Sequence, residues 1–142
     1  MKMKNLFESE NEIKSVVRGF ESGTTGKDDF PHRDHLAMAV WYLRGSDTIE
    51  ATGRMRASLH RFLDHYNSRK NYHETMTVFW IKLVSEVLAS LDDDGSLLRA
   101  TNAVTERLND SRIVYDYYSR ELVGSDEAKQ KWIEPDLKTF KA

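Results

Sequence analysis

The sequence predicts an all-α fold, a single-domain compact bundle of about five to seven helices spanning residues 1–142. Hydrophobic residues recur at helical spacing along nearly the whole chain, with no alternating stretch long enough to indicate a strand. Pro31 and Pro135 are the only two prolines in its 142 residues, so few positions force a helix to end. A chain of this length can bury one substantial hydrophobic core.

The first three predicted helices have clear start or stop signals. The first covers 9–21, with apolar residues at helical spacing, and stops at the turn that contains Gly23. The second starts at Pro31, because proline fits the first helical turn, and ends near residue 45. Its apolar run predicts the most buried helix. Asp47 followed by Glu50 matches an N-terminal capping pattern and predicts a third helix ending near residue 69.

The remaining helices are read from periodicity and capping residues. A fourth helix over about 72–91 is apolar on most sides but carries Lys82 and Glu86, as expected of a core helix rather than a membrane span. A fifth is expected over 96–108, and a short aromatic one over 113–118. Ser125 is a candidate cap for a last helix that ends before Pro135.

Composition and charge exclude several classes of function. The chain has no cysteine, which excludes disulfides, thiolate metal sites, iron–sulfur clusters and cysteine nucleophiles. Its formal net charge of -2 gives no overall electrostatic reason to expect nucleic acid or an anionic membrane as a partner. The longest apolar run, over 36–43, is much too short to cross a bilayer. We expect a soluble cytoplasmic protein that uses neither partner, while homo-oligomers stay possible.

Three of the five histidines are predicted to face the core. At about 100° per residue, His32 and His35 share the apolar face of the second helix, and His73 heads the apolar stripe of the fourth. Glu74 lies at the edge of that stripe. If the second and fourth helices pack with these ends together, three imidazoles and one carboxylate converge.

This group predicts a site for a divalent transition metal, because imidazole and carboxylate are suitable ligands for such ions. The predicted ligands are His32, His35, His73 and Glu74. If Glu74 is not a ligand, it is the candidate general base for a metal-bound water. Tyr72 and Tyr118 are the candidate donors to a substrate oxygen. The sequence does not decide whether the protein is an enzyme.

Two other interpretations of the same residues stay open. In one, the chain is a non-catalytic module that binds a small ligand or a partner in a pocket lined by histidines and tyrosines, without a metal. In the other, each histidine is an ordinary partly buried side chain, and the polar clusters hold helices together. A cavity without a metal would favour ligand binding.

Four short motifs occur in order between residues 30 and 137: Phe30-Pro31-His32-Arg33-Asp34-His35-Leu36, Tyr72-His73-Glu74-Thr75, Tyr118-Ser119-Arg120-Glu121 and Glu134-Pro135-Asp136-Leu137. They resemble the motifs Phe-x-His-x-x-His-Leu, Tyr-His-Glu-Thr, Tyr-Ser-Arg-Glu and Glu-Pro-Asp-Leu of a family of small bacterial helical proteins whose activity is uncharacterised. The resemblance implies that the metal-site candidates, both tyrosines, Ser119 and Arg120 belong to the family pattern. It implies no particular reaction.

Overall fold

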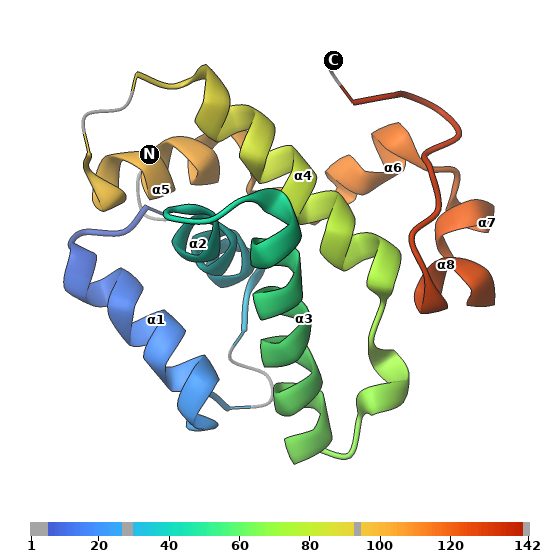
Figure 1. Cartoon of the computed structure of the whole chain (residues 1–142), viewed down its shortest axis with the longest axis horizontal. Coiled ribbons are helices and arrows are strands. Elements are labelled where there is room, and N and C mark those ends of the chain that lie inside the picture. The colour runs from blue at the N-terminus through green and yellow to red at the C-terminus, as the bar shows by residue number, and fades with distance from the viewer. Residues whose placement is uncertain (1–5, 27–29, 93–94, 141–142) are drawn as a thin grey trace.

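A computed structural model describes residues 6–26, 30–92 and 95–140, and these residues form helices and their connections, with no strand (Figure 1). The predicted all-α class is therefore confirmed. The described residues contain eight α-helices: α1 (Glu10–Ser22), α2 (His32–Leu43), α3 (Thr48–His65), α4 (Glu74–Ser90), α5 (Leu97–Leu108), α6 (Val114–Tyr117), α7 (Arg120–Val123) and α8 (Asp126–Gln130). Two short 3-10 helices, η2 (Arg69–Asn71) and η3 (Ser111–Ile113), join them.

The expected number of five to seven helices is slightly too low, and the difference lies near the C-terminus. The sequence predicts two short helices after α5, whereas the structure has three. The additional helix, α7, is a single turn whose N-cap is Ser119, and the hydroxyl of Ser119 accepts a hydrogen bond from the N–H of Leu122. A helix of four residues is too short to show a hydrophobic period, which explains why periodicity does not reveal it.

Most predicted helix starts are correct, because capping is a local interaction. The side chains of Ser9, Asp47 and Ser96 each accept a hydrogen bond from the backbone N–H three residues later, as N-caps do. α4 starts later than expected, at Glu74, so His73 is its N-cap rather than part of its first turn. α3 ends at His65, before the position near 69 that the sequence suggests.

α2 lies at the centre of the bundle and contacts α1, α3, α4 and α5 (Figure 1). All residues from Leu36 to Val40 are buried. This burial follows from sequence, because a helix that is apolar on every side requires neighbours all round. The expectation of a highly buried second helix agrees with the structure.

The C-terminal segment packs against the start of α4. α8 contacts α4 directly, and the hydroxyl of Thr75 donates to the carbonyl of Lys131 at 2.7 Å while accepting from the N–H of Ile133 at 3.2 Å. These bonds connect residues more than fifty positions apart. They place the start of α4 between α3 and the C-terminal helices, where most of the candidate residues lie.

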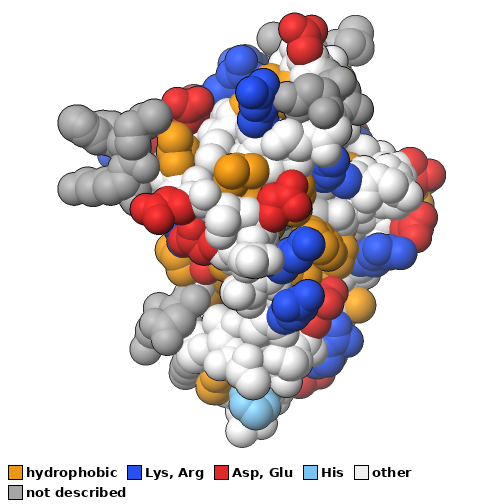
Figure 2. Space-filling view, turned by 90° about the vertical axis from the view of Figure 1, so that its left-hand side faces the viewer, with side chains coloured by type: hydrophobic (Ala, Val, Ile, Leu, Met, Phe, Trp, Pro, Cys, Tyr) orange, Lys and Arg blue, Asp and Glu red, His pale blue; other side chains and the backbone are white. Residues whose placement is uncertain are grey.

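On the face that Figure 2 shows, acidic and basic side chains are interspersed, with hydrophobic side chains visible in small areas between them. Ile49 and Leu137 are the large hydrophobic residues most exposed among the described residues. None of the described helices combines the length and hydrophobicity that a bilayer-spanning segment needs.

Candidate functional site

The ends of α2 and α4 approach each other, and His32, His35, Tyr72 and His73 line one cavity of about 500 Å³. The rest of its wall is mainly apolar and aromatic, with side chains from α3, α4 and the segment around α6. They include Phe30, Met55, Phe62, Met76, Trp80 and Tyr115. The predicted convergence of the three histidines therefore takes the form of a shared cavity.

His32 is fixed at one side of this cavity by the end of α5. Its Nε2 lies 3.1 Å from the carbonyl oxygen of Leu108, and a carbonyl only accepts, so Nε2 carries the hydrogen. The ring also meets Trp80 edge-on, with centroids 4.4 Å apart. Burial lowers the pKa of His32, so the neutral ring is favoured.

His35 differs from the other two histidines because its ring makes no hydrogen bond with any residue in the described part of the chain. Its ring stacks on Phe30 at a centroid distance of 3.7 Å. Burial, with a smaller effect from nearby His32, lowers the pKa of His35 to about 3, so the ring is neutral near pH 7. A neutral imidazole offers one donor and one acceptor, and no described residue binds either of them here.

His73 has a structural position that uses both of its ring nitrogens. Nδ1 accepts from the backbone N–H of Met76 at 3.1 Å, which caps α4. Because Nδ1 is the acceptor, Nε2 carries the hydrogen and donates to the carbonyl of Val123 at 2.6 Å. His73 thus joins the start of α4 to α7, and neither nitrogen is available for a metal in this arrangement.

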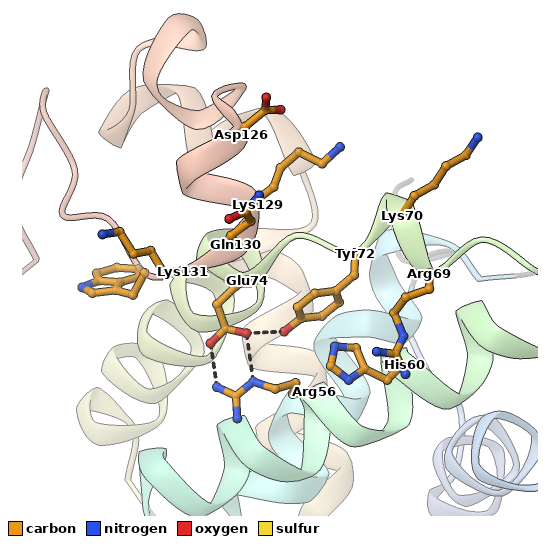
Figure 3. A pocket seen from close by; sticks show the side chains of 11 residues that line it. Arg56, His60, Arg69, Lys70, Tyr72, Glu74, Asp126, Lys129, Gln130 and Lys131 are labelled. Carbon is orange, nitrogen blue, oxygen red and sulfur yellow. Dashed lines mark hydrogen bonds and ion pairs between the residues drawn. The ribbon is translucent and has the colours of Figure 1, made fainter.

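Glu74 forms an ion pair with Arg56 of α3. Nε and Nη2 of Arg56 donate to the two carboxylate oxygens at 2.9 and 2.6 Å, and the hydroxyl of Tyr72 donates to Oε1 at 2.6 Å (Figure 3). The hydrogen bond from Arg56 is the largest cause that lowers the pKa of Glu74. Burial, followed by the hydrogen bond that Tyr72 donates to Glu74, raises the pKa of Tyr72 to about 12. At neutral pH Glu74 is ionised and Tyr72 keeps its proton.

Tyr118, the other candidate donor, lies away from this group. It is fully buried, its ring packs edge-on near Phe79, and its hydroxyl donates to the carbonyl of Ile133. Burial raises its pKa far above the ordinary value. These contacts attach the C-terminal segment to the core, and Tyr118 does not line the histidine cavity.

The four predicted metal ligands do not form one ligand group. Within the described ranges, no three histidine, aspartate or glutamate side chains are placed to hold a metal ion together. The contacts give the reason: both nitrogens of His73 are hydrogen-bonded, and a cation at Glu74 would meet the guanidinium of Arg56. His32 and His35 are neighbours, with ring centroids 6.5 Å apart.

Arg56 and His60 are the residues of this region that the sequence does not indicate. They lie one turn apart on α3, where charged residues are typical of any solvated helix face. Glu74 follows Arg56 by 18 positions, and no local spacing predicts that they pair. Only the packing of α3 against the start of α4 shows it.

Comparison of this chain with protein-family models, with curated proteins and with solved structures gave no match. The resemblance carried by the four motifs stays a prediction.

Proposed function

We propose that this protein binds a small, uncharged, largely apolar molecule in the cavity lined by the three histidines. The proposal depends mainly on His35, a neutral imidazole that opens on an apolar cavity and has no hydrogen-bond partner among the described residues. The ring nitrogens are accessible from the cavity, because neither is among the fully buried polar atoms without a partner in the described residues. A ligand that brings a hydroxyl, carbonyl or amide to His35 meets a donor and an acceptor that no described residue occupies.

The size and lining of the cavity support the same function. A volume of about 500 Å³ is within the usual range of small-molecule sites, which are mostly apolar with a few polar groups that orient the ligand. Phe30 stacks on His35 and holds its ring in one orientation, while Trp80 provides a flat wall beside His32. The low pKa of His35 also disfavours its charged form, so a neutral ligand fits better than an anion.

A matched pair of probes tests this proposal. 1-Naphthol and naphthalene share one aromatic body, but only 1-naphthol can hydrogen-bond to His35. We expect both probes to change Trp80 fluorescence. 1-Naphthol should bind about fivefold more tightly than naphthalene, because a neutral hydrogen bond contributes about 1 kcal/mol. His35→Phe keeps the stacking on Phe30 and should remove this preference, whereas His65→Phe, on an exposed surface, should retain it.

The outcomes of this experiment are distinct. If neither probe affects Trp80, the cavity does not admit an aromatic ligand and the proposal fails. If both bind equally to the natural protein, the role of His35 fails. A Trp80→Phe variant, which must lose the fluorescence response, shows that the signal comes from this tryptophan and not from Trp41 or Trp132.

The divalent metal is the second candidate for the same histidines. It is supported by the closeness of His32 and His35, but less so by His73 and Glu74, whose ligand atoms are already bonded. Elemental analysis of protein purified without an affinity tag tests it. A stoichiometric metal, or a rise in melting temperature with zinc, iron, nickel or manganese that His32→Ala abolishes, would favour this candidate.

A further inference from the structure

A second pocket, which we call the basic pocket, lies beside the histidine cavity and has the opposite chemistry. It has a volume of about 690 Å³ and takes its lining from α3, η2, the start of α4 and α8 (Figure 3). Its acidic lining residues are Glu74 and Asp126. The basic ones are five: Arg56, Arg69, Lys70, Lys129 and Lys131. The formal charge of these lining residues is therefore about +3, although the whole chain carries -2.

Both arginines of the basic pocket are held in place by carboxylates. Arg56 uses Nε and Nη2 to bind Glu74, and Arg69 uses the same two nitrogens to bind Asp64 at 2.9 and 2.6 Å. The Nη1 donors of both guanidinium groups stay outside these ion pairs. An arginine fixed in this way loses less conformational freedom when it binds an anion.

The lysines supply the excess positive charge. Lys131 pairs with Glu127 at 3.1 Å. Lys70 and Lys129 have no ion-pair partner among the described residues, and they extend from η2 and α8 at the rim of the pocket in Figure 3. If each ion pair is counted as neutral, the two positive charges of these lysines still outnumber the single negative charge of Asp126.

His60 lies inside this group of charges. Its ring lines the basic pocket and meets Tyr72 edge-on, with centroids 4.4 Å apart. Burial and then the charge of Arg69 lower its pKa. The charged or titratable groups around it come from α3, from η2 and from the start of α4: Arg56, Asp64, Arg69, Tyr72 and Glu74.

We propose that the basic pocket binds the phosphate group of a small molecule. Planar guanidinium groups match the oxygen atoms of a phosphate, and ammonium groups add charge without strict geometry. This second site is separate from the apolar ligand cavity, although Tyr72 lines both. The proposal therefore does not require that an apolar ligand binds near His35.

Titration of the full chain with inorganic phosphate, followed by NMR, tests this inference, with chloride at equal ionic strength as the reference. We expect phosphate to shift the side-chain signals of Arg56 and Arg69, and Lys70→Gln with Lys129→Gln to weaken binding about tenfold, because each charged hydrogen bond contributes substantially. Lys14→Gln with Arg18→Gln on α1 removes the same charge outside the pocket and should leave phosphate binding unchanged. Circular dichroism verifies that both double variants fold.

The titration of His60 gives a readout that needs no variant. A bound phosphate favours the positively charged imidazole, so the pKa of His60 should rise when phosphate replaces chloride. The inference is overturned if phosphate leaves the arginine signals and the His60 pKa unchanged, or if the lysine variant binds phosphate as tightly as the natural protein. Because 1-naphthol carries no charge, its binding result is independent of both outcomes.

Discussion

Substitution of His73 should separate the two hydrogen bonds that its ring makes. His73→Ala removes both the cap on Met76 and the bond to Val123. Loss of an N-cap costs about 1 kcal/mol, and loss of one internal hydrogen bond costs about 1 kcal/mol more. His73→Asn retains a side chain that caps helices well but is too short to reach Val123. We therefore expect losses of about 2 kcal/mol for alanine and about 1 kcal/mol for asparagine.

Urea unfolding followed by circular dichroism measures these differences. In a domain of this size each kcal/mol corresponds to roughly 3 to 4 °C in melting temperature, so both variants are resolvable by heating as well. His65→Ala is the control, because His65 is exposed and its ring lies edge-on to Tyr66, and its effect should stay within about 0.5 kcal/mol. Equal stability of the asparagine and alanine variants would refute the capping role. An unchanged alanine variant would refute the whole argument.

Three further substitutions test other features of the structure. Glu74→Gln should cost about 1 kcal/mol at pH 7, since the carboxylate pairs with a partly exposed arginine. The pKa of Glu74 in the folded protein is below its ordinary 4.5, so the full stability difference between the natural protein and this variant is present above pH 4.5. The difference should disappear as the pH falls through the folded pKa, and urea unfolding at several pH values measures it. Between pH 6.5 and 3 the unfolded chain protonates His35 and the folded chain does not, so the free energy of unfolding falls as the pH is lowered. His35→Gln should remove this contribution, and the slopes of unfolding free energy against pH should then differ by up to about 1.4 kcal/mol per pH unit. Equal slopes would contradict the neutral buried ring. Gly23→Ala should cost about 1 kcal/mol in urea unfolding, because Gly23 ends α1 at a φ of 79°, and an unchanged stability would count against that conformation.

The site was predictable to the extent that it depends on helical faces. Spacing alone places His32 and His35 on one face of the second helix and His73 at the head of the apolar stripe of the fourth. In the structure these three histidines line the same cavity. The role of His73 was not predictable. Its position one residue before α4 turns a candidate ligand into a cap, and a boundary difference of one or two residues is within the usual uncertainty of reading helix ends from sequence.

The pairing of Glu74 could not be predicted for a different reason. On sequence alone Glu74 is a carboxylate beside a histidine, which is compatible with a metal ligand or a general base. In the structure, Arg56 approaches from another helix and occupies both oxygens. The chemistry of a carboxylate depends on which charge lies within a few ångströms of it, and that is a property of packing.

The sequence by itself determined the helical class, the five longer helices and the burial of α2. These features follow from hydrophobic period and capping, which act between residues at most a few positions apart. The tertiary structure decided the pairing of His73 with Val123, the pairing of Glu74 with Arg56, and the separation of an apolar cavity from a basic pocket on either side of Tyr72. Each of these depends on contacts between residues far apart in the chain, and the local pattern carries no information about such contacts.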